Sequence, residues 1–296
     1  MKLRTRLLVI TLGLTLIVSA LTPAPEPGKF VFPIEFGSES KIVARETLDA
    51  RGKTARYMVY LPKGYASGSK SYPVLYLLHG ASGNETSWSN PDQGNMKEIC
   101  DRYFARRRDR KMIVVMPDGR DAWYRNAYDS DDAFEDYFFN ALIPSVEREF
   151  RCKTNRKNRA VAGLSMGGYG TLLYATRHAE QFGVAVAMSP AVYSLRERNE
   201  RNGVVMDEAR RKYEQEYDVV AALDHIEWKD APRIMIDCGD EDFCLKGAYE
   251  FFQKARDKYI PVELRVRDGK HEWEYWRVSL VMALDFFFED SRLLGR

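Results

Sequence analysis

The 296-residue sequence lacks three features that would direct it to other classes of protein. It has no internal repeats or low-complexity tracts, no C-x-x-C pair, and no second long apolar run after the one at its N-terminus. Without a C-x-x-C pair a structural zinc site is not expected, and without a second apolar run neither is a multi-spanning membrane protein. With 45% hydrophobic and 12% aromatic residues, the composition is typical of a globular protein and excludes a disordered chain or a coiled coil.

The first 20 residues are typical of a secretory signal peptide. Three basic residues precede the apolar run Leu7–Leu21, and Val18-Ser19-Ala20 suits a small-residue cleavage site. We therefore expect a secreted or periplasmic protein with no stable membrane insertion after cleavage; an uncleaved anchor is the alternative. Removing residues 1–20 lowers Lys+Arg from 45 to 42 against 43 Asp+Glu, which leaves a net charge of −1. This charge predicts no nucleic-acid partner.

Cysteine is scarce, with four residues in the chain. In an exported protein an even number permits disulfides. Cys238 and Cys244 bracket a short loop and form the expected local pair, which leaves Cys100 to pair with Cys152. The alternative is that all four are free, since buried thiols behave as small apolar side chains.

The rest of the chain predicts an extended Pro/Gly-rich leader at 21–38 and one α/β domain at 39–292. Strand patterns alternate with helical ones, which favours a three-layer sandwich around a mainly parallel sheet, preceded by an antiparallel hairpin. Pro144 is expected to break or kink the helix that contains it. The predicted strands are 41–48, 55–61, 73–79, 112–116, 159–163, 184–188, 233–237 and 262–266; the predicted helices are 95–108, 135–150, 170–176, 250–259 and 273–288.

The segment Gly163-Leu164-Ser165-Met166-Gly167 follows a strand pattern and opens a helical one. A serine at the apex of such a strand-to-helix turn is the nucleophile elbow, G-x-S-x-G, of α/β-hydrolases. Gly163 and Gly167 are needed because the turn is so tight that a Cβ there would collide with neighbouring backbone. The pattern predicts Ser165 as a nucleophile; the alternative is a Gly-rich turn that caps a helix.

A serine hydroxyl needs a histidine to accept its proton, and that histidine needs a carboxylate to orient it. In this fold the chain order is serine, acid, histidine, and only four histidines are present. His271 alone has a suitable place, between the last predicted strand and the last helix. The acid should follow the strand that ends at Asp237, where Asp240, Glu241 and Asp242 compete. Spacing favours Asp242 only slightly over Asp240.

The oxyanion of an acyl-transfer intermediate needs two N–H donors. Met166, directly after the serine, supplies one, and Ala81 in the Gly-rich segment 79–83 is the expected second. His79 is expected to hold this segment in shape and to take no part in the chemistry. Aromatic residues expected near the mouth of the site could line an acyl or sugar subsite. They are Trp88, Trp123, Tyr124 and Trp273.

The charged stretch 194–228 interrupts the strand–helix alternation. We expect it to form exposed helices, either as a lid or substrate rim near the site or as a solvated surface insertion. The basic run 106–111 falls at a predicted helix end, where a solvated helix terminus explains it better than a binding patch.

Several motifs, occurring in order over about residues 40–290, together resemble the esterase D family of α/β-hydrolases. They are Leu78-His79-Gly80, Pro117-Asp118-Gly119, Trp123-Tyr124, the elbow through Gly170, Asp237-Cys238-Gly239-Asp240-Glu241-Asp242-Phe243 and His271-Glu272-Trp273. The family includes S-formylglutathione hydrolases, tributyrin esterases, feruloyl and acetyl xylan esterases, and mycolyltransferases. The resemblance implies Asp242 as the triad acid and an oxyanion donor after Leu78-His79-Gly80.

Together with the signal-peptide pattern, the resemblance implies an exported serine carboxylic-ester hydrolase that releases feruloyl, acetyl or short acyl groups from polysaccharide or small esters, without a metal or cofactor. S-formylglutathione hydrolases are generally cytosolic and commonly have histidine at the position of Leu164, so they fit less well. The alternatives are an acyltransferase of the mycolyltransferase type, an S-formylglutathione hydrolase-like thioesterase, and a non-catalytic carbohydrate-binding relative.

Overall fold

One twisted eight-stranded sheet organises the computed structural model, which describes residues 39–49, 51–192, 207–227 and 229–289. Its strands run in the order β1-β2-β4-β3-β5-β6-β7-β8. Their bounds are β1 Lys41–Leu48, β2 Thr54–Leu61, β3 Val74–Leu78, β4 Ile113–Pro117, β5 Arg159–Leu164, β6 Val184–Met188, β7 Arg233–Gly239 and β8 Val262–Arg267. All eight predicted strands are therefore confirmed, to within two residues at each end.

The sheet is antiparallel at one edge and parallel elsewhere. β1 and β2 form an antiparallel hairpin in which Lys41 lies opposite Leu61, and β2 is also antiparallel to β4. From β4 to β8 every pair of neighbours is parallel. The prediction of a mainly parallel sheet with an N-terminal antiparallel hairpin is confirmed. Because parallel strands end at the same edge, the loops after β3, β5, β6, β7 and β8 gather there.

The central strands are buried on both faces, as their continuous apolar sequences predicted. In β3, Val74, Tyr76 and Leu78 belong to the hydrophobic cluster on one face of the sheet, whereas Leu75 and Leu77 belong to the cluster on the other. This alternation follows from the two-residue period of a strand. Each face therefore needs its own layer of helices.

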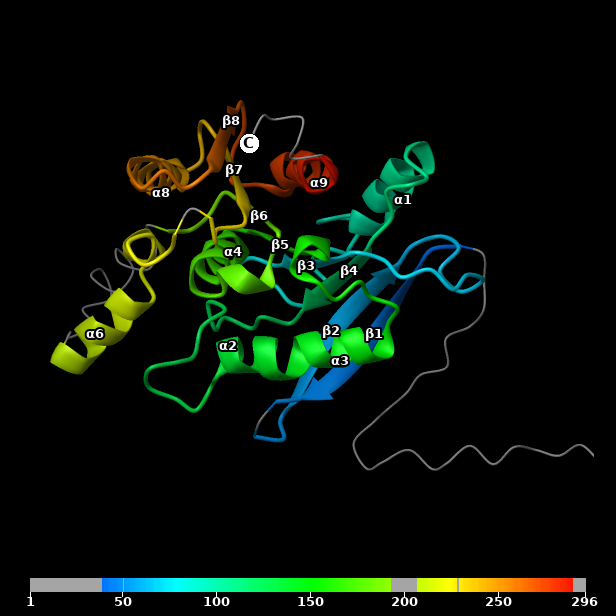
Figure 1. Cartoon of the computed structure of the whole chain (residues 1–296), viewed down its shortest axis with the longest axis horizontal. Coiled ribbons are helices and arrows are strands. Elements are labelled where there is room, and N and C mark those ends of the chain that lie inside the picture. The colour runs from blue at the N-terminus through cyan, green and yellow to red at the C-terminus, as the bar shows by residue number, and fades with distance from the viewer. Residues whose placement is uncertain (1–38, 50, 193–206, 228, 290–296) are drawn as a thin grey trace, which may run out of the picture.

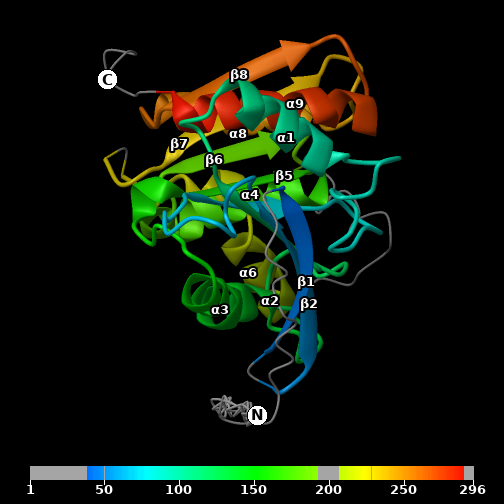
Figure 2. The ribbon, with the colours of Figure 1, turned by 90° about the vertical axis from the view of Figure 1, so that its right-hand side faces the viewer.

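Helices α1 and α9 cover one face, and the other helices that contribute buried side chains cover the opposite face (Figures 1 and 2). Their bounds are α1 Met96–Arg106, α2 Phe134–Tyr137, α3 Ile143–Glu149, α4 Met166–Arg177, α6 Glu208–Glu216, α7 Val219–Ala222, α8 Leu245–Asp257 and α9 Trp273–Phe288. Short 3₁₀ turns lie at Arg156–Asn158 and Ala179–Gln181. The three-layer α/β architecture is confirmed.

Pro144 does not break its helix. It lies in the first turn of α3, directly after a π-helical turn at Phe138–Leu142 that continues α2. A proline lacks the N–H that the helix would use, and a widened turn accommodates the missing bond and the ring. The run from α2 to α3 consequently stays helical along the edge of the molecule (Figure 1).

The described part of the charged insertion forms α6 and α7; residues 193–206 and 228 lie outside the described residues. α6 extends from the body of the molecule (Figure 1) and buries none of its residues. It is attached to the loop after β4, where Arg125 pairs with Glu214 at 2.9 Å and the Tyr213 hydroxyl donates to the Asn126 carbonyl. The expectation of exposed helices holds for α6, and whether the insertion forms a lid stays a prediction.

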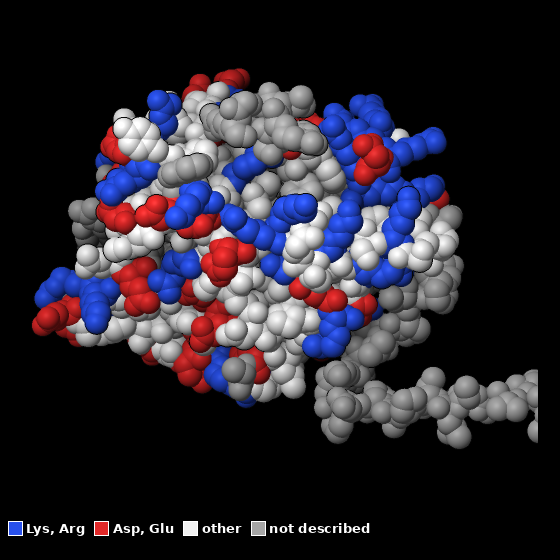
Figure 3. All heavy atoms as spheres, viewed as in Figure 1, with Lys and Arg blue, Asp and Glu red and all other residues white. Residues whose placement is uncertain are grey.

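The surface carries both signs of charge in alternation (Figure 3). Basic side chains gather over the α1 end of the face shown there. α1 ends at Arg106, where the basic run begins, and Arg107 pairs with Asp285 of α9 at 3.3 Å. The basic run therefore lies at a helix terminus, as predicted, with one of its charges paired to α9.

The predicted disulfides are wrong, because all four cysteines are free. Cys100 belongs to the hydrophobic cluster under α1 and α9, whereas Cys152 packs against the cluster on the opposite face. The sheet therefore separates them. Cys238 and Cys244 lie in the same cluster, but their thiols have other hydrogen-bond partners, Ser189 for Cys238 and Asp242 for Cys244.

The predicted signal peptide at 1–20 and leader at 21–38 lie outside the described residues. Among the helices that the structure describes, none is both long and apolar enough to span a bilayer.

Candidate active site

Ser165 stands at the turn between β5 and α4 with φ 55° and ψ −115°. This backbone conformation is strained for a residue with a side chain. Two backbone hydrogen bonds hold it: the Ser165 N–H donates to the Met188 carbonyl at 2.9 Å, and the Ala191 N–H donates to the Ser165 carbonyl at 3.0 Å. The strain is thus maintained by the last residue of β6 and the loop that follows it.

The two flanking glycines are required by contact with backbone. A Cβ on Gly163 would lie 2.5 Å from the Gly167 carbonyl oxygen, and a Cβ on Gly167 would lie 2.5 Å from the Leu78 carbonyl oxygen. Neither contact is possible without a shift of the main chain. The predicted nucleophile elbow, with both of its glycines, is present.

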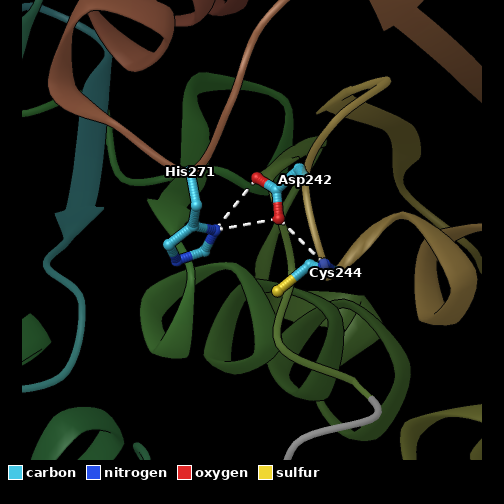
Figure 4. Close-up of side chains that lie close together, drawn as sticks. All are labelled: Asp242, Cys244 and His271. Atoms are coloured by element: carbon cyan, nitrogen blue, oxygen red, sulfur yellow. Dashed lines mark hydrogen bonds and ion pairs between the residues drawn. The ribbon is translucent and has the colours of Figure 1, made fainter.

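One hydrogen-bonded chain joins the three residues predicted to form the triad. The Ser165 hydroxyl lies 2.9 Å from His271 Nε2, and His271 Nδ1 lies 2.9 Å from Asp242 Oδ2 and 3.0 Å from Oδ1. Figure 4 shows the Asp242 carboxylate facing the His271 ring edge-on. Of the two candidate acids, Asp242 makes this contact, while Asp240 bonds to the Gly269 N–H. The preference for Asp242 agrees with this geometry.

The environment of Asp242 favours its ionised form. Burial alone would raise the pKa of this carboxyl, but hydrogen bonds from His271, from the Cys244 N–H at 2.8 Å and from Ser189 outweigh burial and hold the pKa below its ordinary value. A carboxylate at this position fixes the His271 tautomer with its proton on Nδ1, which leaves Nε2 free to accept the Ser165 proton.

Asp242, Cys244 and His271 each present a potential metal-ligand atom, and these three atoms lie within 4.8 Å of one another (Figure 4). Metals bind the thiolate form of cysteine. Burial raises the pKa of the Cys244 thiol, which disfavours the thiolate form. His271 Nδ1 is already bonded to Asp242. The donor set therefore suits a hydrogen-bonded triad better than a metal site.

The segment after β3 lies directly against the elbow. A Cβ on Gly80 would lie 3.3 Å from the Ser165 Cβ, so the residue before Ala81 lies directly beside the serine. The Met166 N–H is the first of α4, and the first N–H groups of a helix have no partner within it. The pairing of Ala81 and Met166 as oxyanion donors stays a prediction.

His79 holds this segment in place. The Gly119 N–H donates to His79 Nε2 at 2.8 Å, so the ring proton is on Nδ1, which donates to the Gly80 carbonyl at 2.7 Å. Burial lowers the pKa of His79 and keeps the ring neutral. The expected structural role of His79 agrees with these contacts.

Two of the four aromatic residues expected to line the substrate site do not do so. Trp88 is buried and donates from Nε1 to the Leu78 carbonyl at 3.0 Å. Tyr124 is also buried, and its hydroxyl donates to the His79 carbonyl at 2.9 Å. Their side chains are used to fix the backbone that leads into the oxyanion segment, because a buried polar group must find a partner.

The other two aromatic residues are partly exposed. Trp273 packs edge-on against Trp88 and Trp276, and the Trp276 ring lies 4.8 Å from the His271 ring. Trp123 packs edge-on against Tyr169 in the first turns of α4. Trp273 is thus connected to the His271 ring through Trp276, and whether either residue lines a substrate site stays a prediction.

Sequence reasoning missed Phe243 and Ser189. Phe243, which follows the triad acid, is 68% exposed although its ring centroid is only 4.3 Å from that of His271. Ser189 is buried, accepts a hydrogen bond from Trp276 Nε1 at 3.0 Å and helps to lower the pKa of Asp242. The available signals were an aromatic residue beside the acid and a serine directly after a buried parallel strand.

The mixed sheet, the strained serine and the hydrogen-bonded triad define an α/β-hydrolase of the serine carboxylic-ester hydrolase class. The family described as "Putative esterase" matches residues 50–287, and the chain belongs to this family. The resemblance seen in the sequence motifs is thereby confirmed.

Similar proteins have names that fit this class. An endo-1,4-beta-xylanase/feruloyl esterase of Xylanibacter ruminicola is 38% identical over 49% of this chain and 21% of its own length. An acetyl esterase of Caldicellulosiruptor saccharolyticus is 23% identical over 75% of this chain and 86% of its own. A solved ferulic acid esterase structure is 30% identical, with a TM-score of 0.74, and the match covers 86% of this chain and 98% of that one.

Proposed function

We propose that this protein hydrolyses carboxylic esters through an acyl-enzyme formed on Ser165. The observation that carries the proposal is the continuous hydrogen-bonded chain from Ser165 Oγ through His271 to Asp242. In the first step Ser165 Oγ attacks the ester carbonyl while His271 Nε2 takes the hydroxyl proton, and His271 then returns this proton to the leaving alcohol. In the second step His271 activates a water that attacks the acyl-enzyme and releases the acid.

The N–H groups of Ala81 and Met166 are proposed to stabilise the negative oxygen of the two tetrahedral intermediates. Donors that are fixed before the reaction lower the barrier because they need no reorganisation as the charge develops. Here Gly80 lies against Ser165, and His79 fixes the Gly80 carbonyl. These contacts support a rigid oxyanion hole.

The substrate is proposed to carry a feruloyl, acetyl or short acyl group on a polysaccharide or small alcohol. The named relatives and the 30% identical ferulic acid esterase support this class. Phe243 offers apolar ring surface beside His271, and Trp273 packs against Trp276, whose ring also contacts His271; an aromatic acyl group or a sugar face could pack on these rings. The segment 1–20 has the composition of a signal peptide, so we propose that the enzyme acts outside the cytoplasm.

A substrate panel tests this proposal. Methyl ferulate, acetylated xylan, p-nitrophenyl acetate and S-formylglutathione would be compared by kcat/KM, with Ser165→Ala as the control. We expect hydrolysis of the oxygen esters and a loss of about four to six orders of magnitude in the variant, since the nucleophile is removed. If Ser165→Ala were as active as the wild-type protein, Ser165 could not be the nucleophile. A preference for S-formylglutathione would show that the protein is a thioesterase.

A further inference from the structure

Two segments meet at the triad and determine its acid–base distance. The acid segment, Gly239–Cys244, begins at the last residue of β7 and carries Asp242. The base segment, Asp268–Glu272, joins β8 to α9 and carries His271. Since His271 contacts Asp242 with one ring nitrogen and Ser165 with the other, a shift of the base segment would lengthen at least one of these hydrogen bonds.

The backbones of the two segments are in direct contact. The Asp240 N–H donates to the Arg267 carbonyl at 3.0 Å, and the Glu241 N–H donates to the Gly269 carbonyl at 3.2 Å. A Cβ on Gly239 would lie 2.1 Å from the Gly269 carbonyl oxygen, and Gly269 has φ +146°. The base segment thus takes a conformation that requires glycine, two residues before His271.

Asp237, at the end of β7, anchors the flanks of the base segment. Its buried carboxylate accepts hydrogen bonds from Arg267 at 2.7 Å, before the segment, and from the Tyr275 hydroxyl at 2.9 Å, after it. Ser279 of α9 donates to the same carboxylate at 2.5 Å. These contacts hold β8 and α9, but none of them reaches the middle of the segment.

The Asp240 side chain supplies the contact in the middle. Its Oδ1 accepts the Gly269 N–H at 3.0 Å. This is the only side-chain acceptor recorded for that N–H among the described residues, and Asp240 itself is exposed and makes no recorded hydrogen bond to His271. With the Glu241 N–H bonded to the Gly269 carbonyl, the acid segment holds both polar groups of Gly269.

We propose that Asp240 is a positioning residue for His271, acting through the Gly269 N–H. Three aspartates, Asp237, Asp240 and Asp242, then act on the base segment in different ways. Asp237 holds the two ends of the base segment, Asp240 holds its middle, and Asp242 orients the His271 ring. The role depends on an oxygen acceptor at Asp240 and not on its negative charge. It rests on the function proposed above.

Two substitutions distinguish the effect of losing the hydrogen-bond acceptor at Asp240 from the effect of losing its negative charge. Asp240→Ala removes the hydrogen-bond acceptor, so the base segment can move. We expect kcat on p-nitrophenyl acetate to fall about three- to tenfold, which is the scale of one lost hydrogen bond. KM should stay within about twofold of the wild-type value. Asp240→Asn keeps an oxygen acceptor without the charge and should restore kcat to within about twofold of wild type. Because Asp240 is exposed, both variants should fold, and their melting temperatures check this.

Glu241→Ala is the matched control. Glu241 is the neighbouring exposed carboxylate, and within the described residues its side chain pairs with Lys270, 3.4 Å apart, with both side chains more than half exposed. Such pairs contribute little, and the Glu241 N–H that bonds to Gly269 is retained. We expect kcat within about twofold of wild type.

Three results would overturn the positioning role: unchanged kcat in Asp240→Ala, an equal loss in Asp240→Asn, which would assign the effect to charge, or an equal loss in Glu241→Ala. These outcomes differ from a failure of the proposed function itself. In that case the wild-type protein would not hydrolyse the ester, or Ser165→Ala would keep its activity.

Discussion

At the residue scale, the site depends on which carboxylate faces His271. Asp242 accepts hydrogen bonds from both the His271 ring and the Cys244 N–H, and these bonds overcome the effect of burial on its pKa. Asp240, two residues earlier, faces the backbone of Gly269. Two acidic residues of one short loop therefore act on the same histidine by different routes, one on the ring and one on the main chain.

Asp242→Asn should lower kcat on p-nitrophenyl acetate by about three to four orders of magnitude. An amide can donate to Nδ1 and so stabilise the wrong tautomer, in which Nε2 carries the proton and cannot accept one from Ser165. The measurement is steady-state kinetics at neutral pH, with melting temperatures to show that the variant is folded. Asp240→Asn is the control, and a larger loss there than in Asp242→Asn would reassign the acid.

At the element scale, the strand-to-helix turn is limited by backbone packing. β5, α4 and the segment after β3 approach so closely at the elbow that carbonyl oxygens occupy the places of two side chains. The serine therefore protrudes at the carboxyl edge of the sheet, because Gly163 and Gly167, two residues before and after it, have no side chain to accommodate.

Gly163→Ala should lower kcat/KM by at least about tenfold and the free energy of unfolding by about 2–3 kcal/mol. The added methyl would overlap the Gly167 carbonyl at 2.5 Å, and overpacking on this scale shifts the backbone. Kinetics and urea unfolding measure the two effects. Gly52→Ala is the control, since Gly52 has φ +75° but open space around it. This substitution should lower the free energy of unfolding by about 1–2 kcal/mol through backbone strain alone and leave kcat/KM unchanged. Normal kinetics in Gly163→Ala would contradict this account of the elbow.

At the scale of the whole molecule, one buried carboxylate joins the start of α2 to the end of α4. Glu135 lies 2.7 Å from His178 Nε2 and 3.0 Å from Arg177 Nε. Burial would raise the pKa of Glu135, but these two partners outweigh burial and lower the pKa below its ordinary value of 4.5. The ionised carboxylate thus stabilises the fold.

This lowered pKa predicts how stability depends on pH. A carboxyl with a lower pKa in the folded than in the unfolded state contributes its full stabilisation above the unfolded value, near 4.5, and loses it as the pH falls through the folded value. The melting temperature should therefore fall below about pH 4.5, and Glu135→Gln, less stable at pH 7, should show a flatter dependence. Glu98→Gln, which removes an exposed partner of Arg102, is the control, and its melting temperature should depend on pH as steeply as that of the wild-type protein. Equal slopes in wild type and Glu135→Gln would contradict this role.

The sequence by itself determined the order of strands and helices along the chain, the elbow at Ser165, the choice of His271 and the short list of acids. These follow from local patterns: continuous apolar runs for buried strands, glycines where a turn is tight, and a chain order that the chemistry requires. These signals sufficed because each strand, helix and turn depends on residues close in sequence, and because the order of the triad residues can be read along the chain.

Only the tertiary structure decided which side chains meet across segments. It directed Trp88 and Tyr124 into the interior, left Phe243 exposed beside His271, and placed Cys100 and Cys152 on opposite faces of the sheet. It also separated Asp240 from Asp242, which spacing alone could hardly distinguish. The physical reason is that these contacts depend on strand order and on the path of loops between β3, β7 and β8, which the sequence pattern of any one segment does not contain.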